Sequence, residues 1–227
     1  MPVVAAAVCP HPPLLVPEVA SGAAPELDVL RAACLAAIDT LATASSVLVV
    51  GSGNDGAYDG AAGGSFGAYG APGVRIGTGP AVLPLSLAIG GWLLEQSKAA
   101  RLPRTYRAVP AATAPGECVR LGREIAAGND SVGLLVMGDG SARRSEHSPV
   151  HLHPRAEIFD TTVANAFQTD DLDVLEALDP DLAAELQAAG RAPWQVLAGA
   201  LRGTGLAGEL SYEAAPYGVG YFVASFA

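Results

Sequence analysis

Apolar runs alternate along the chain with segments whose apolar residues fall at helical spacing. Residues 3–8, 47–50 and 132–137 are continuous apolar runs, the pattern of strands buried on both faces of a parallel sheet. A shorter run at residues 106–109 predicts one more strand. Between the first two runs, residues 24–43 carry an apolar side chain at every third or fourth position, which predicts an amphipathic helix.

The second half of the chain continues this alternation and ends differently. We expect helices over residues 83–98, 116–127, 157–167, 180–189 and 193–201, with Asp179 as the N-cap of the fourth. Residues 209–214 and 219–226 have the pattern of two strands separated by a turn at residues 216–218, as in a hairpin. The order of elements predicts an α/β fold: a single domain over residues 1–227 with a central mixed β-sheet flanked by helices.

Residues 51–73 fit neither pattern. They are rich in Gly, Ala, Ser and Tyr, and we expect a long loop without regular structure. Loops of this length in a compact domain are usually functional or mobile. Within it, the Gly-rich stretch from Gly60 to Gly73 lacks the spacing and the lysine of a phosphate-binding loop.

Composition and charge exclude several classes of protein. The net charge of the 227 residues is −10 and Lys and Arg do not cluster, which argues against a nucleic-acid-binding protein. We find no signal peptide and no apolar segment long enough to span a membrane, so we expect a cytoplasmic protein without membrane contact. The chain is rich in alanine and low in charge, and a homo-oligomer is a candidate assembly.

The first candidate functional residue is His11, directly after the first predicted strand. It stands in Cys9-Pro10-His11-Pro12-Pro13, where three prolines hold the chain extended as it leaves the sheet. Open α/β sheets usually bind ligands at the carboxyl ends of their strands. His11 is therefore a candidate catalytic or metal-binding residue, whereas a turn-capping histidine is the simpler alternative.

A second candidate, Glu213, lies in the C-terminal segment SYEAAPYGVGY. A carboxylate in an apolar, aromatic segment is rarely buried without a partner. Together His11 and Glu213 would supply two ligands of a two-histidine, one-carboxylate iron site. From the residue types alone, we favour a Glu213 side chain that lies on the exposed face of an edge strand.

Three segments resemble one known family. CPHPPLLVPE around His11, GDGS ahead of RAEIFD, and the terminal SYEAAPYGVGYFVASF are similar to the LigB-like family. These are class III extradiol ring-cleavage dioxygenases of the protocatechuate 4,5-dioxygenase beta-subunit type, structurally related to the Memo proteins. The resemblance extends over nearly the whole chain. It implies a mixed-sheet α/β fold, an iron site of two histidines and one glutamate, and a further acid/base histidine.

The chain departs from the family at two of these positions. His11 matches the first metal histidine and Glu213 the glutamate, but Asn54 stands where the family has its second metal histidine. Ala142 stands where the family has the acid/base histidine. An amide oxygen binds Fe(II) poorly and alanine cannot transfer a proton, so ring cleavage is in doubt.

Other residues are candidates to complete the site. His151 and His153 form a His-x-His pair that could add metal ligands, although a solvated loop is the simpler interpretation. Asp139, in the GDGS run, is a candidate catalytic residue. We list Asn54, Arg143 and Tyr217 as candidate ligand-binding residues, because an arginine could bind a carboxylate or a phosphate.

The sequence does not decide whether the chain is an enzyme, and three functions remain open. The first is a diverged, small-ligand-binding member of the extradiol dioxygenase superfamily, a pseudoenzyme that binds an aromatic or another small molecule. The second is an active oxidoreductase with Fe(II) or Zn held by a modified ligand set around His11 and Glu213. The third is a non-catalytic subunit or interaction protein. We favour the first by a small margin, because the full set of family ligands is not present.

Overall fold

Seven strands form one mixed sheet in the order β3-β6-β2-β7-β1-β9-β8 in the computed structural model, which describes residues 3–128 and 130–227. The strands of this sheet are β1 (Val3–Cys9), β2 (Ser46–Ser52), β3 (Gly56–Tyr58), β6 (Arg104–Val109), β7 (Val132–Met137), β8 (Gly208–Ala214) and β9 (Tyr221–Phe226). A separate hairpin consists of β4 (Gly64–Phe66) and β5 (Ala71–Ile76). The expected α/β fold with a mixed sheet is confirmed.

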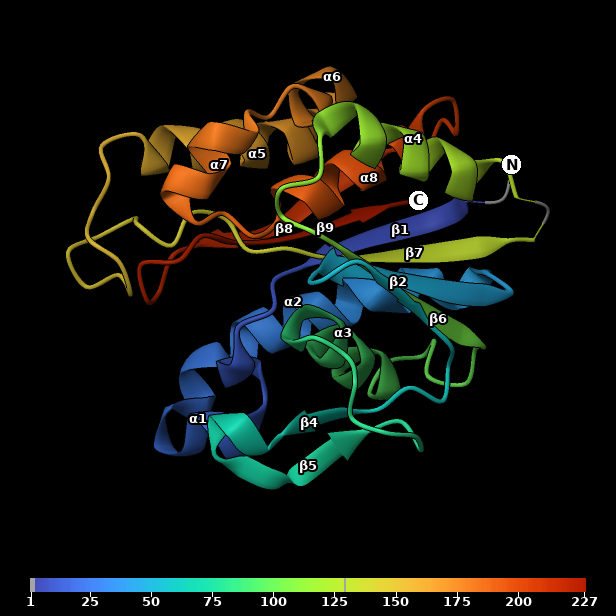
Figure 1. Cartoon of the computed structure of the whole chain (residues 1–227), viewed down its shortest axis with the longest axis horizontal. Helices are drawn as coiled ribbons and strands as arrows, with labels where there is room; N and C mark the ends of the chain where they lie inside the picture. Colours follow the sequence, from blue (N-terminus) through green and yellow to red (C-terminus); the bar gives the residue numbers. More distant parts are fainter. Residues whose placement is uncertain (1–2, 129) are drawn as a thin grey trace.

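Four adjacent strands, β6, β2, β7 and β1, run parallel. Their register places Cys9 beside Met137 and Met137 beside Gly51. The carboxyl ends of these strands therefore lie along one edge, on the left of Figure 1. His11, Asn54 and Asp139 each lie two residues beyond the end of a parallel strand, at this edge.

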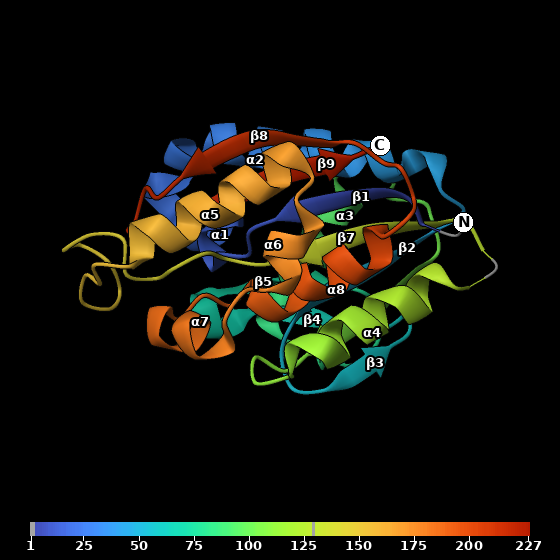
Figure 2. The same ribbon diagram turned by 90° about the horizontal axis from the view of Figure 1, so that it is seen from above.

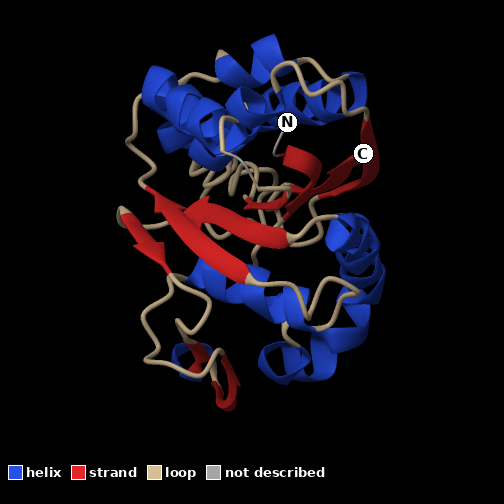
Figure 3. Ribbon diagram, turned by 90° about the vertical axis from the view of Figure 1, so that its right-hand side faces the viewer, coloured by secondary structure: helices blue, strands red, loops and turns tan. Residues whose placement is uncertain are grey.

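Helices cover both faces of the sheet. On the lower face in Figure 1 lie α1 (Pro17–Ala20), α2 (Asp28–Asp39), α3 (Leu85–Glu95) and the β4–β5 hairpin. On the upper face lie α4 (Pro115–Ala126), α5 (Ala156–Thr169), α6 (Leu172–Glu176), α7 (Pro180–Leu186) and α8 (Arg191–Leu201). Figure 3 shows the same three layers from the side. The sheet thus separates two apolar cores, and alternate residues of each central strand point into one or the other.

The expected helix at residues 24–43 is shorter in the structure. Only α2 is α-helical there, and the 3-10 turns η2 (Ser21–Leu27) and η3 (Thr40–Thr43) flank it. Pro25 lies within η2, and it has no N–H with which to extend a helix. At the other end, the hydroxyl of Thr40 donates to the Ala37 carbonyl, a local bond that competes with the helix.

The expectation of a structureless loop at residues 51–73 is wrong. Within these residues lie β3, β4, the 3-10 turn η4 (Gly67–Tyr69) and the start of β5. Gly56 to Tyr58 pair with β6 on the side away from β2. Without β3, the backbone N–H and C=O groups on that side of β6 would have no partner in the sheet. Phe66 is completely buried and anchors the β4–β5 hairpin beneath α3. The glycine content conceals short strands that tertiary contacts stabilise.

The C-terminal hairpin has an irregularity that affects the site. β8 is the edge strand beside β9, as Figure 2 shows, and the two run antiparallel as expected. Leu210 pairs with Ala224, but Tyr212 pairs with Val223, so one extra residue bulges out of β8 between them. From Tyr212 onward, each side chain of β8 points to the opposite face from the one that simple alternation would give.

The helices of residues 3–128 and 130–227 include none that is both long and apolar enough to cross a membrane.

The N-cap role of Asp179 is confirmed, because its carboxylate accepts the N–H of Asp181.

Candidate functional site

The carboxyl-edge segments after β1 and β7 bring His11 and Asp139 together. The strand pairing continues past the strand ends, because the N–H of Gly138 donates to the Cys9 carbonyl at 2.9 Å. One residue further, the backbone N–H of His11 donates to Oδ1 of Asp139 at 2.7 Å. Nδ1 of His11 lies 3.5 Å from the same oxygen. Both of these candidate catalytic residues thus belong to one cluster.

Burial gives this pair its chemical character. His11 is only 8% exposed, and its Nδ1 is buried without a hydrogen-bond partner among the described residues. Burial raises the pKa of Asp139, while the charge of His11 and its N–H act in the opposite direction. Because the two ring nitrogens lie on different sides of an imidazole, Nε2 points away from Asp139. Asp139 therefore anchors the main chain of His11 and lies beside its imidazole ring, 3.5 Å from Nδ1.

Tyr221 is a site residue that the sequence analysis did not select. It begins β9, is 3% exposed, and lies on the face of the sheet that α2 covers. Burial raises its pKa far above the usual value, and the negative charges of Asp139, Tyr217 and Tyr212 add to this effect. Its hydroxyl therefore stays protonated beside Asp139 and can only act as a neutral donor or acceptor.

Tyr217, a candidate ligand-binding residue, lies in the turn between β8 and β9. Its hydroxyl bonds Oε2 of Glu26 in η2 at 2.9 Å. This contact joins the C-terminal hairpin to the segment that follows His11. Its proximity to Tyr221 places Tyr217 at the margin of the His11–Asp139 pair.

The structure does not bring Glu213 to His11. Glu213 pairs with Phe222, so both side chains point to the face that α5 covers. There the charge of Glu213 raises the pKa of Asp160. Asp139, by contrast, lies on the other face. It follows Met137 by two residues, and residues two apart in an extended chain point to the same face. Its charge also raises the pKa of Tyr221, which is buried on that face. The bulge in β8 turns Glu213 away from the site, and its side chain is exposed as the residue types suggested.

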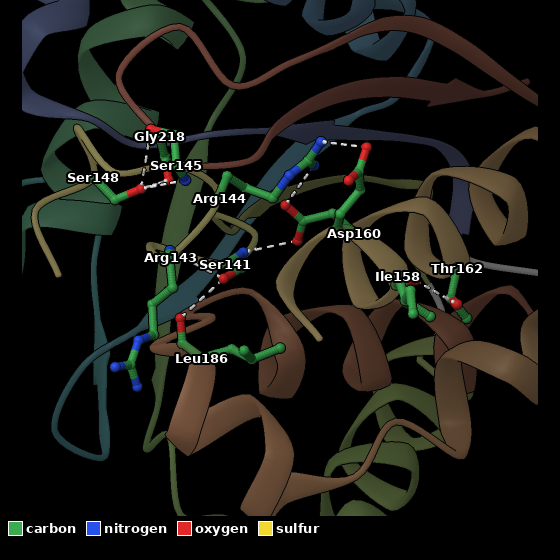
Figure 4. A network of polar contacts seen from close by, with 11 residues as sticks. Ser141, Arg143, Arg144, Ser145, Ser148, Ile158, Asp160, Thr162, Leu186 and Gly218 are labelled. Atoms are coloured by element: carbon green, nitrogen blue, oxygen red, sulfur yellow. Dashed lines mark hydrogen bonds and ion pairs between the residues drawn. The ribbon is translucent and has the colours of Figure 1, made fainter. Parts of the chain in front are cut away.

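A buried polar network lies on the α5 face, and Figure 4 shows it. Asp160 of α5 is fully buried; its Oδ1 accepts the N–H of Ser141 at 2.8 Å and its Oδ2 accepts from Arg144 at 3.0 Å. Burial raises the pKa of Asp160 to about 6, against the opposing effects of the Ser141 N–H and Arg144. A Cβ atom at Gly220 would lie 2.2 Å from the Asp160 carboxylate, which explains a glycine there. The network fixes the loop after Asp139.

The two arginines of this loop are engaged in the network. Arg143 donates to the backbone carbonyls of His151 and Glu185, each at 2.8 Å. Arg144 pairs with Asp160 at 3.0 Å and with Glu157 at 3.9 Å. Arg143, a candidate ligand-binding residue, therefore has two of its donors occupied by main-chain acceptors.

The remaining candidates lie apart from the pair. Asn54 is exposed in the bend after β2, and β7 separates β2 from β1, so about 10 Å of sheet lies between the two strand ends. His151 is exposed and His153 is half-buried in the loop before α5, where Nδ1 of His153 accepts the Arg155 N–H at 3.2 Å. Ala142 donates its N–H to the Leu186 carbonyl.

These positions decide whether the donors fit a metal. Within residues 3–128 and 130–227, no three His, Cys, Asp or Glu side chains come together as metal ligands. His11 and Asp139 offer two adjacent donors, whereas a facial triad needs a third protein ligand. The donor set that the family resemblance implies therefore does not fit the residues present.

A hollow lies beside the edge strand β3, away from the His11–Asp139 pair. It encloses about 620 Å³ between β3, β6 and α4, and Leu48, Arg107 and Leu121 line it. Two of its charged residues are paired with neighbours outside the lining, Arg107 with Asp55 and Glu124 with Arg120. The hollow has no cluster of reactive groups comparable to His11 and Asp139, so we place the candidate site at the pair.

No protein-family model matches this chain. No curated protein matches it either. Among solved structures, it is similar to the crystal structure of uncharacterized protein JW3007 from Escherichia coli K12, with a TM-score of 0.59 and 14% identity. The match covers 98% of this chain and 99% of the other. This likeness shows a shared fold and carries no functional information.

Proposed function

We propose that the chain is a small-molecule-binding protein related to the extradiol dioxygenases and diverged from their ring-cleaving chemistry. Its ligand site is the His11–Asp139 pair. The observation that carries the proposal is the pairing itself: at the carboxyl ends of the strands, the backbone N–H of His11 donates to Oδ1 of Asp139, 128 positions away, and Nδ1 of His11 lies 3.5 Å from the same oxygen. This edge is where open α/β sheets bind their ligands.

The pair is suited to binding a hydroxyl group. Asp139 holds the imidazole of His11 in place, and Nε2 can then exchange a hydrogen bond with a ligand hydroxyl or accept its proton. Tyr212 and Tyr217 pack on the same face of the sheet and are half-buried, so part of each aromatic ring is exposed. An aromatic ring that carries hydroxyl groups matches both features.

The test is binding of 4-methylcatechol, measured by isothermal titration calorimetry. We expect saturable binding to the wild-type protein and a loss of at least about tenfold in affinity for His11→Ala, which corresponds to about 1.4 kcal/mol. His147→Ala is the matched control, because it removes an exposed imidazole from the loop before α5. Equal binding by wild type and His11→Ala would rule out this site.

Metal analysis of the purified protein tests the oxidoreductase alternative. The proposal expects no stoichiometric iron or zinc, because the described residues supply two adjacent donors where a triad needs three. Stoichiometric Fe or Zn that disappears in His11→Ala would replace the proposal with a metal-dependent enzyme. Light scattering tests the third alternative, in which the site is closed within a homo-oligomer or against another subunit.

The proposal places the protein in the cytoplasm. Cys9, Cys34 and Cys118 are all free and buried, which is compatible with a reducing compartment.

A further inference from the structure

We infer that the His11–Asp139 site selects a small ligand that carries a positive charge, such as a protonated amine, over an otherwise identical carboxylate. The inference rests on the proposed function and adds the chemical class of the ligand. It reverses the expectation that Arg143 binds an anion.

The arginines around the site are held by other groups. Arg143 donates to two main-chain carbonyls, and Arg144 pairs with the buried Asp160. Both pairings fix the loop after Asp139. Releasing Arg144 for a ligand would also leave the buried Asp160 carboxylate without its cation. An anionic ligand would have to compete with the protein's own structure for these cations.

A third arginine, on the segment that follows His11, is also held. Arg31 of α2 donates to the carbonyls of Leu15 and Ala24 and pairs with Asp28. Its side chain is only 13% exposed. Arg31 thus closes the turns of residues 13–27 and does not face the site as a free charge.

The groups that face the site are acidic or aromatic. Asp139 supplies a carboxylate that is 16% exposed and lies 3.5 Å from Nδ1 of His11. At the margin, Tyr217 bonds the carboxylate of Glu26. After burial, the charge of Asp139 is the next cause that raises the pKa of the Tyr221 hydroxyl, which places the Asp139 carboxylate near this tyrosine.

This arrangement favours a cation for two reasons. A carboxylate in a poorly solvated environment attracts a nearby ammonium group more strongly than it would in water. Aromatic rings attract a cation through their negative faces. A ligand carboxylate would instead lose its hydration beside the carboxylate of Asp139, while the arginines of the neighbouring segments are already paired with other groups, which is costly.

The test compares three ligands that share one ring. They are 3,4-dihydroxybenzylamine, 4-methylcatechol and 3,4-dihydroxybenzoate, which are cationic, neutral and anionic near pH 7. Isothermal titration calorimetry at low and at moderate salt gives the three dissociation constants. We expect the amine to bind about tenfold more tightly than the methyl compound, the benzoate to bind most weakly, and salt to reduce the differences.

Asp139→Asn tests the source of the preference. The amide oxygen can still accept the His11 N–H, so the local structure is retained while the charge is removed. We expect the amine and the methyl compound to bind this variant with nearly equal affinity. Glu124→Gln, which removes an exposed acid on α4, is the matched control and should keep the wild-type preference. Thermal unfolding of each variant confirms that it is folded.

The outcomes separate the two hypotheses. If the benzoate binds as well as the amine, and His11→Ala weakens both, the charge preference is overturned and the proposed site stands. An amine preference that persists in Asp139→Asn also overturns the inference. If none of the three ligands binds, the proposed function fails and the inference fails with it.

Discussion

The backbone N–H of His11 donates to Oδ1 of Asp139 at 2.7 Å, although the two residues are 128 positions apart in the sequence. The bond continues the pairing of β1 with β7 beyond their last paired residues, Cys9 and Met137. The carboxylate therefore has a structural role and also lies 3.5 Å from Nδ1 of the His11 imidazole. Substitutions at Asp139 can separate the two roles.

We expect Asp139→Ala to lower the free energy of unfolding by about 1–3 kcal/mol, because it leaves the His11 N–H without an acceptor. Asp139→Asn retains an acceptor oxygen and should cost less than half as much. Urea denaturation followed by circular dichroism measures both values. Equal losses for the two variants would show that the carboxylate charge, and not the hydrogen bond, stabilises this edge.

The parts of the site that could be predicted from the sequence are those fixed by position along the chain. His11 and Asp139 each follow a buried apolar run, and parallel strands bring such positions to one edge. Tyr221 could not be selected among six tyrosines, because its role depends on a position near Asp139 that only the fold creates. The last tyrosine of the YGVGY segment was nevertheless part of the family resemblance.

Glu213 shows why the rest was not predictable. Leu210 packs toward the α5 face, so simple alternation would direct Glu213 to the opposite face, toward the pair. The extra residue between Leu210 and Tyr212 reverses that direction. A single bulge leaves no mark in the hydrophobic pattern. The fold class could be predicted from the hydrophobic pattern alone. Which side chains reach the site, by contrast, depended on a one-residue shift in the pairing of β8 with β9.

The burial of Asp160 makes the stability of the fold depend on pH. Its pKa of about 6 in the folded protein exceeds the ordinary value of 3.8, so the folded state retains its proton more firmly than the unfolded state. This contribution is fully present below about pH 4 and is lost as the pH rises to about 6. The loss is on the order of 3 kcal/mol.

The measurement compares wild type with Asp160→Asn from pH 4 to pH 7. Other carboxylates titrate in both proteins, so the difference between their free energies of unfolding isolates Asp160. We expect wild type to lose stability relative to the variant as the pH rises through this range. A difference that does not change with pH would mean that Asp160 titrates normally.

Arg144 is the cation that limits this shift. Arg144→Gln removes the positive charge that lowers the pKa of Asp160, so we expect that pKa to rise above about 6. The inflection in stability should then move to higher pH, and the protein should be destabilised near pH 7 by about 3 kcal/mol or more. Arg120→Gln, which breaks an exposed pair on α4, is the control and should leave the inflection unchanged.

We expect replacement by alanine to have opposite effects at two glycines of α4, Gly122 and Gly116. Gly122 lies against α8, where a Cβ atom would approach the Val196 carbonyl oxygen to 2.0 Å and the Ala200 nitrogen to 2.7 Å. Both are backbone atoms, so the helices must separate to accept a methyl group, and we expect Gly122→Ala to cost about 1–3 kcal/mol or more. A Cβ atom at Gly116, in the first turn of the same helix, would meet nothing within 4 Å.

Gly116→Ala should therefore stabilise the protein by about 0.5 kcal/mol, because alanine restricts the unfolded chain without a clash. Differential scanning calorimetry of the two variants gives the comparison directly. The midpoint of unfolding should fall for Gly122→Ala and rise slightly for Gly116→Ala. Similar behaviour of the two would contradict the close packing of α4 on α8, which supports the α5–α8 face of the sheet behind the candidate site.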